Sequence, residues 1–143
     1  MALKVGAEEM MAFLDEVFPQ VRGEFAIDRM DEELLVMRLK VADRHLRPGG
    51  TVSGPAMFGL ADVAAYVATM ARIGKEALAV TTNCSIDFMR KPAAGADLLA
   101  EARVLKLGRA LSVTEVHLRS EGQEELVARA NLTYSIPPRR SEA

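Results

Sequence analysis

The sequence predicts an α+β fold in which a curved antiparallel sheet of five to six strands wraps around one long central helix. The first observation is a run of small and apolar residues from Gly54 to Arg72. The second is that two extended segments precede this run and four follow it. A helix that is apolar nearly all round must be covered on most of its surface, so we expect the sheet to curve around it. We expect one domain over residues 1–143, with its core at about 24–136 and a frayed tail at 137–143.

An N-terminal helix is expected over about residues 7–19. Apolar side chains recur there at helical spacing, and Pro19 ends the pattern. Extended segments follow at 25–30 and 34–41, with acidic residues suited to a turn at 31–33. This pair predicts a β-hairpin.

The segment 42–53 lacks a hydrophobic period and contains one proline and two glycines, which is typical of a loop. The long helix follows directly. Ser53 or Gly54 can cap its N-terminus, and Pro55 is tolerated in the first turn because the missing N–H has no partner there. Gly74 suits the C-terminal end.

Alternating residues predict that the remainder of the chain is β-structure. Strict alternation over 78–88 predicts a strand with Cys84 on one face and Thr81 on the other. Three further strands are expected at 97–107, 111–119 and 125–135.

Apolar residues on the outer face of the predicted sheet also predict a partner subunit.

Composition narrows the classes of function. The net charge is −2 and the pI about 5.7, with no long basic run, so we expect no nucleic-acid partner. A single cysteine, Cys84, and the lack of a signal pattern predict a cytoplasmic location. His45 and His117 have no ligands at metal spacing, so no metal site is expected. A membrane span is not expected, because Asp62 interrupts the apolar helix.

Asp62 is the most informative residue of the long helix. Helical spacing places it on one face with Phe58, Tyr66 and Thr69. A carboxylate in apolar surroundings must be paired, hydrogen-bonded or protonated, and it is a candidate general base. The alternative is a structural acid that hydrogen-bonds Tyr66, Thr69 or a loop backbone.

The turn before the helix is the second chemical feature. Helix N-termini expose unpaired N–H groups, which bind anions and can hold an oxyanion. Gly50 and Gly54 allow a ligand to approach the backbone closely; the alternative is an ordinary loop and a well-capped helix. Asp62 follows Gly54 by eight residues, or about 12 Å. One chain cannot easily place both groups on one reacting carbon, but a second copy can.

The stretch HLRPGGTVSGPAMFGLAD at 45–62 resembles the signature of hotdog-fold acyl-CoA thioesterases of the PaaI-like branch, approximately HxNxxGxxHGGxxxxLxD. The order of elements over about 25–136 is similar as well. The resemblance implies a homodimer in which the helix acid of one subunit is the base or nucleophile. A Gly N–H at the opposing helix N-terminus then polarises the thioester carbonyl. It also implies acyl-CoA as substrate and no separate cofactor. The expected assembly is a homodimer or a dimer of dimers, and the sequence leaves the choice between dimer and tetramer open.

By position, this resemblance gives catalytic roles to two residues, Asp62 as the acid and Gly54 as the oxyanion donor. Thr81 falls where some members place a hydroxyl that orients the attacking water. His45 matches the leading histidine of the pattern, and Gly50 its middle glycine.

Three positions depart from the pattern. Arg47 stands in place of Asn, Ser53 in place of His, and Pro55 in place of the second Gly. Pro55 removes one N–H but leaves that of Gly54. Arg47 is suited to bind a ligand carboxylate or phosphate, or to pair with Asp62.

The remaining candidates are substrate contacts. Arg90 and Lys91 end the first long strand and suit the phosphates of coenzyme A, although a solvated strand end is the alternative. Met57, Phe58 and Tyr66 are expected on the acyl side. The complete predicted binding set is His45, Arg47, Gly50, Ser53, Met57, Phe58, Tyr66, Arg90 and Lys91.

Three functions follow from these features. The first is hydrolysis of an acyl-CoA thioester. The second is non-catalytic binding or sensing of acyl-CoA, since three motif positions have changed. The third is hydration or dehydration of acyl thioesters, which usually needs a His paired with an acid; His45 is available for that role.

Overall fold

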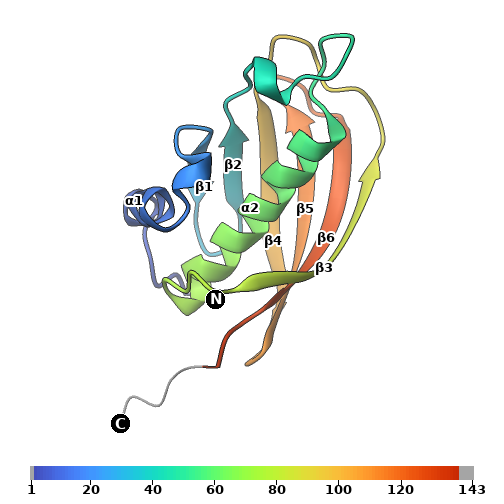
Figure 1. Cartoon of the computed structure of the whole chain (residues 1–143). Helices are drawn as coiled ribbons and strands as arrows, with labels where there is room; N and C mark the ends of the chain where they lie inside the picture. The colour runs from blue at the N-terminus through green and yellow to red at the C-terminus, as the bar shows by residue number, and fades with distance from the viewer. Residues whose placement is uncertain (1, 139–143) are drawn as a thin grey trace.

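The structure is a computed structural model that describes residues 2–138, and it confirms the predicted α+β architecture. Six antiparallel strands form one sheet in the order β1-β2-β4-β5-β6-β3. Helix α2 (Gly54–Ile73) lies across its concave face (Figure 1). Residues 139–143 of the predicted tail lie outside the described residues. The strands are β1 (Phe25–Met30), β2 (Leu35–Leu39), β3 (Val80–Phe88), β4 (Leu98–Leu107), β5 (Leu111–Ser120) and β6 (Leu126–Ser135).

Helix α2 begins at the predicted Gly54 and ends at Ile73, one residue beyond the predicted Arg72. The Ser53 hydroxyl accepts a hydrogen bond from the Ala56 N–H at 3.2 Å, which makes Ser53 the N-cap. Gly74 follows the helix with φ +102°, a conformation that residues with a side chain rarely adopt. By length and composition α2 is apolar enough to cross a membrane, but most of it is buried inside the protein. Burial to this extent is typical of a helix in the core of a folded domain.

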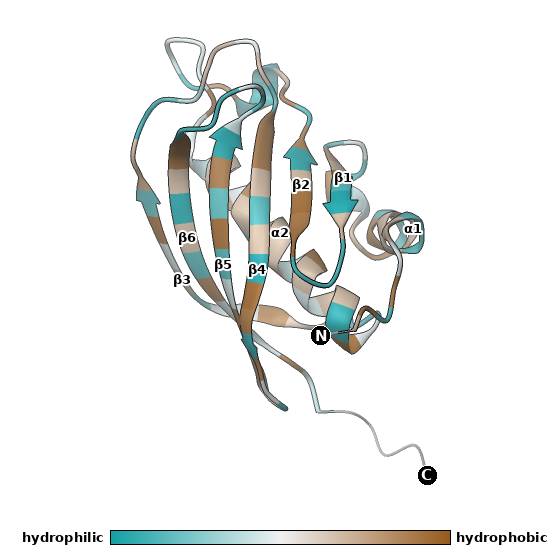
Figure 2. Ribbon diagram, turned by 180° about the vertical axis from the view of Figure 1, so that it is seen from behind, coloured by the Kyte–Doolittle hydropathy of each residue, from teal (hydrophilic) through white to brown (hydrophobic). Residues whose placement is uncertain are grey.

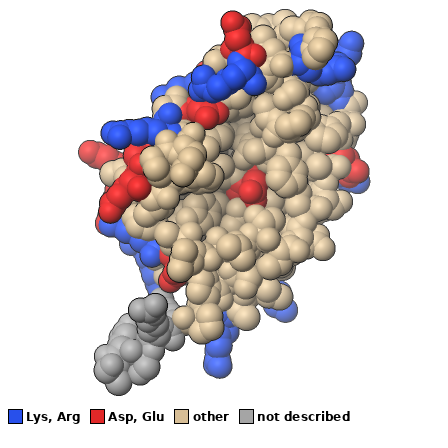
Figure 3. All heavy atoms as spheres, viewed as in Figure 1, with Lys and Arg blue, Asp and Glu red and all other residues tan. Residues whose placement is uncertain are grey.

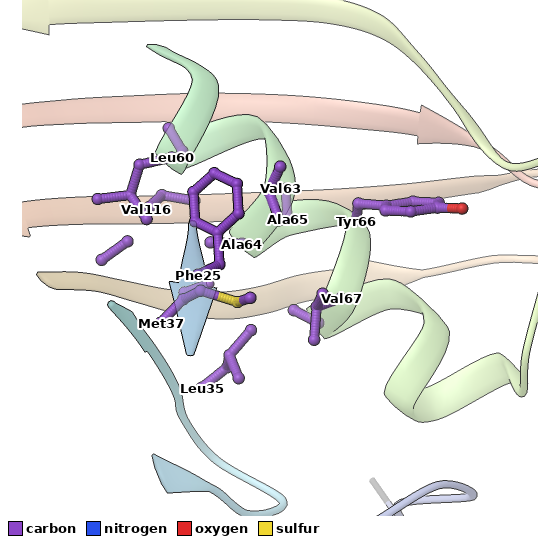
Figure 4. Packing of buried hydrophobic residues seen from close by; sticks show 14 of the residues in the cluster. Phe25, Leu35, Met37, Leu60, Val63, Ala64, Ala65, Tyr66, Val67 and Val116 are labelled. Atoms are coloured by element: carbon purple, nitrogen blue, oxygen red, sulfur yellow. The ribbon is translucent and has the colours of Figure 1, made fainter. Parts of the chain in front are cut away.

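Small side chains allow the sheet to approach α2 closely. Ala61, Ala64 and Ala68 are fully buried. Larger side chains on either side of them pack against the hairpin strands, where Phe25 and Met37 meet the helix (Figure 4). Tyr66 belongs to the same cluster, and its ring extends away from Phe25 and Met37 (Figure 4).

The N-terminal helix covers the hairpin side of the sheet. Helix α1 (Ala7–Val17) buries Met10 and Leu14 and packs beside β1 (Figure 1). A short 3₁₀ turn (Pro19–Val21) follows it. The predicted hairpin is confirmed, because β1 and β2 pair antiparallel.

The strict alternation predicted for 78–88 is wrong at its start. In the pairing of β3 with β6, Thr81 lies opposite Tyr134 and Cys84 opposite Leu132, with a register shift between Thr81 and Asn83. Cross-strand neighbours lie on the same face of a sheet, so Thr81 and Cys84 both face α2. The bulge adds one residue to β3 and thereby turns Thr81 inward.

Candidate active site

Asp62 lies in an open cleft of about 450 Å³ where α2 meets the edge of the sheet. Its half-buried carboxylate accepts two hydrogen bonds at the same oxygen. The Thr81 hydroxyl donates to Oδ1 at 2.5 Å, and the Tyr134 hydroxyl donates to Oδ1 at 2.7 Å. We call this site the acid cleft; its lining residues are Val17, Phe18, Asp62, Tyr66, Ala77, Ala79, Val80, Thr81 and Tyr134.

Tyr134 is a site residue that the sequence analysis missed. Its side chain is only 3% exposed, and its ring stacks on Tyr66 with a centroid distance of 5.8 Å. Burial, and then the charge of Asp62, raise the pKa of Tyr134 far above its ordinary value, so the hydroxyl stays protonated. The available signal was a tyrosine in the inward register of a strand, because a buried tyrosine hydroxyl needs a partner.

The partners of Asp62 differ from those expected. Tyr66 donates instead to the carbonyl oxygen of Ala77 at 2.7 Å, and Thr69 hydrogen-bonds Ser112 at 2.9 Å. Within residues 2–138 no cation forms an ion pair with Asp62, and Arg47 lies in a different cleft. The acid is therefore held by neutral hydroxyl groups from β3 and β6.

A second cleft, of about 350 Å³, lies at the N-terminal end of α2. Three exposed cations gather around it, and basic side chains concentrate at this end of the molecule (Figure 3). Within the described part of the chain none of the three forms an ion pair. We call this site the basic cleft; its lining residues are Arg47, Thr51, Val52, Gly54, Met57, Phe88, Met89, Arg90, Lys91 and Pro92.

Gly54 supplies the backbone group of the basic cleft. It is the first residue of α2, so its N–H has no acceptor within the helix. The ring of Phe88 covers it, and a Cβ added at Gly54 would lie 3.5 Å from that ring. Met57 lines the same cleft, whereas Phe58 is exposed and lines neither cleft.

Besides Phe58, three predicted binding residues lie outside both clefts. These three hold the loop instead. His45 is buried, with the Ala42 N–H donating to Nδ1 at 2.9 Å and Nε2 lying 2.8 Å from Glu24. Because Nδ1 accepts, Nε2 carries the proton. Ser53 caps α2, and Gly50 adopts φ +85° in the turn before it.

The acid and the backbone donor stand in separate clefts of one chain. They lie eight residues apart on one straight helix, or about 12 Å. A third cavity, of about 540 Å³ beside Arg72 and Arg109, contains no acid, histidine or cysteine in its lining. Within residues 2–138 no three His, Cys, Asp or Glu side chains gather into a metal site.

The thiol of Cys84 offers a test of the charge on Asp62. Burial, and then the negative charge of Asp62, raise the pKa of this half-buried thiol. Only the thiolate is nucleophilic, so we expect slow alkylation by iodoacetamide near pH 8. Asp62→Asn removes the charge and lowers the pKa of Cys84, which should accelerate alkylation at that pH.

The matched control for this experiment is Asp87→Asn. Asp87 is an exposed acid on the same strand, paired with Arg129 at 3.0 Å. Its removal should leave the alkylation rate unchanged. Equal alkylation rates in the wild type and Asp62→Asn would show that the charge of Asp62 does not affect the pKa of the Cys84 thiol.

Comparison with known proteins places this arrangement among thioesterases. The sequence profile of the thioesterase superfamily matches residues 49–127. Acyl-coenzyme A thioesterase 13 from Homo sapiens is 28% identical over 121 residues, which cover 83% of this chain and 84% of that protein.

Solved structures agree with this match. A candidate thioesterase from Silicibacter sp. TM1040 has a TM-score of 0.91 and 59% identity, with 96% of each chain covered. A mutant of the phenylacetic acid degradation protein PaaI from Thermus thermophilus has a TM-score of 0.71 and 28% identity, covering 83% of this chain and 99% of that chain. These similarities and the topology confirm the hotdog fold.

Proposed function

Because the chain belongs to the thioesterase superfamily, we propose that it hydrolyses the thioester of an acyl-CoA, with Asp62 as base or nucleophile. One observation carries the proposal. Asp62 is the single acid among the residues that line the acid cleft, and two hydroxyl groups hold it without a neutralising cation. A carboxylate placed in this way is suited to take a proton or to attack a carbonyl carbon.

The reaction balances with water as the only co-reactant. In the general-base route Asp62 takes a proton from water, and the water oxygen bonds to the thioester carbonyl carbon. The carbonyl oxygen becomes an oxyanion, which the N–H of Gly54 in the partner subunit stabilises. The C–S bond then breaks, and the thiolate receives the proton. In the nucleophilic route a carboxylate oxygen of Asp62 bonds to the carbonyl carbon, and the C–S bond breaks so that CoA leaves as its thiolate. Water then hydrolyses the resulting anhydride, which releases the acyl group as a carboxylic acid, regenerates Asp62 and supplies the proton that the thiolate takes up.

A second copy of the chain is part of this proposal. Among the described residues, strand β3 lies at the edge of the sheet with β6 as its single neighbour. Exposed apolar side chains extend along it, among them Val80 and Phe88, and the surrounding face is largely uncharged (Figure 3). A free strand edge beside exposed apolar groups is suited to pairing with another chain. Such pairing can bring the acid cleft of one subunit to the basic cleft of its partner.

The outer face of the sheet supports pairing of dimers into a tetramer. Leu34 just before β2, Val36 on β2 and Leu99 on β4 form a small apolar cluster that is separate from the main core. The outer face shows such apolar bands between polar ones (Figure 2). We retain the cytoplasm as the proposed location, because the one cysteine has no intrachain disulfide partner.

Release of free thiol from acyl-CoA is the direct test of the proposed hydrolysis. We expect the double variant Arg90→Gln/Lys91→Gln to raise KM for acyl-CoA about tenfold, because two cations near the phosphates are lost. The same variant should leave KM for the matching acyl-pantetheine unchanged, since that substrate lacks the nucleotide phosphates. An equal rise in KM for both substrates would mean that Arg90 and Lys91 do not bind the phosphates of coenzyme A.

The two alternatives predict different outcomes. A binding or sensing protein would be stabilised against heat by acyl-CoA without releasing thiol. A hydratase needs a histidine at the reacting atoms, and His45 instead has both ring nitrogens engaged by Ala42 and Glu24. Neither cleft contains a histidine among its lining residues.

A further inference from the structure

We propose that Tyr134 is a positioning residue of the reaction. Together with Thr81 it fixes Oδ1 of Asp62, so that Oδ2 is the oxygen that takes the proton or attacks the carbonyl. The inference rests on the proposed function, because it assigns separate roles to the two carboxylate oxygens of the proposed catalytic acid.

The hydrogen bonds around Asp62 distinguish its two oxygens. Both hydroxyl donors converge on Oδ1, at 2.5 Å from Thr81 and 2.7 Å from Tyr134. Within residues 2–138 no donor reaches Oδ2. No buried side-chain oxygen or nitrogen of the described chain lacks a hydrogen-bond partner, so Oδ2 must be open to the cleft. One oxygen is thus an anchor and the other is available for chemistry.

Tyr134 is itself held rigidly. Its strand β6 lies between β5 and β3, and its ring stacks on Tyr66 at an interplanar angle of 22°. Its hydroxyl also lies 3.0 Å from the backbone carbonyl oxygen of Asp62, so it contacts the acid through both side chain and main chain. Groups placed on packed strands hold a reacting atom more precisely than groups on loops.

The two donors also have different origins in the fold. Thr81 reaches Oδ1 because of the bulge in β3, whereas Tyr134 reaches it from the regular part of β6. The carboxylate therefore has two supports, which restrict its rotation about the last side-chain bond. Restricted rotation keeps Oδ2 in an attacking geometry.

Tyr134→Phe tests the proposal. A hydrogen bond to a charged group contributes about 1.5–3 kcal/mol, so we expect kcat to fall about ten- to hundredfold with little change in KM. The ionised carboxylate loses a donor that favours its charged form, so the acidic limb of the pH–kcat/KM profile should move to higher pH. The other ionisable groups that face Asp62 are Tyr66 on α2 and Cys84 on β3.

Tyr66→Phe is the matched comparison. It also removes one hydroxyl from the same pair of stacked rings, but that hydroxyl bonds Ala77 and not Asp62. The acidic limb of the pH–kcat/KM profile of Tyr66→Phe should stay at the wild-type position, whatever effect this substitution has on KM. Thr81→Val removes the other donor to Oδ1 and should shift the limb in the same direction as Tyr134→Phe.

The outcomes separate the positioning role from the proposed function. If Asp62→Asn is inactive while Tyr134→Phe keeps wild-type kcat and an unmoved limb, the positioning role is overturned and the function stands. If Asp62→Asn retains full turnover, the function itself fails. Thermal unfolding shows whether Tyr134→Phe folds. If it does not fold, Thr81→Val provides the test. An unchanged kcat and an unmoved acidic limb of the pH–kcat/KM profile in Thr81→Val would overturn the proposal that two hydroxyl donors fix Oδ1.

Discussion

Replacing Asp62 with Asn is expected to lower kcat for thioester hydrolysis by about 10²–10⁴-fold, the contribution typical of a general base. The amide matches the carboxylate in shape but neither accepts a proton from water nor attacks the thioester readily. Its oxygen can still accept hydrogen bonds from Thr81 and Tyr134, so the fold should persist. The measurement is thiol release under saturating acyl-CoA, with thermal unfolding as the check on folding.

Asp87→Asn is the control for this substitution. It also exchanges a carboxylate for an amide, at an exposed position on the neighbouring strand outside both clefts. We expect Asp87→Asn to retain turnover, and Asp62→Asn to retain binding of acyl-CoA. Near-normal turnover in Asp62→Asn would remove Asp62 from the mechanism.

Replacing Gly54 with Pro is the second change with a large expected effect. It deletes the N–H proposed as the oxyanion donor, and loss of one such donor typically costs about 10²–10³-fold in kcat. Proline suits the first helical position, and Ser53 before it is already extended, with ψ 159°. Because Pro55 follows directly, thermal unfolding of Gly54→Pro is the check that the variant folds. Gly54→Ala is the control: it keeps the N–H, and its Cβ would make an ordinary contact with Phe88 at 3.5 Å.

Mixing the two inactive variants tests whether a site combines residues from two chains. A dimer of one Asp62→Asn chain and one Gly54→Pro chain has one site with both groups intact and one with neither. Random pairing should then restore about a quarter of wild-type activity, as expected for a symmetric two-chain interface. No recovery after subunit exchange would mean that each site uses the acid and the N–H of the same chain, or that the two groups do not act together.

Local patterns in the chain were enough to predict the architecture. The long helix has Pro55 near its start and Gly74 after its end, and its interior carries few polar groups, so its bounds were predicted within one residue. Strand β5 and most of β6 follow the simple alternation of half-buried strands. Such signals depend only on neighbours along the chain.

The details of the site depended on contacts between distant segments. The bulge that turns Thr81 toward Asp62 interrupts a run that alternates regularly in sequence, and only the pairing of β3 with β6 reveals it. Tyr134 lies 72 positions from Asp62 and matches no motif. His45 matches the family pattern, yet Glu24 on the hairpin side engages its ring.

Residue types and their spacing were sufficient to indicate a helix that needs burial and an acid within it. Periodicity records which face of each element is apolar, and that information is local. The surroundings of that acid arise from strand register and from the curvature of the sheet, which no short window of sequence contains. The two hydroxyl groups on Oδ1, the open Oδ2 and the separation of acid and backbone donor into two clefts are therefore properties of the folded chain.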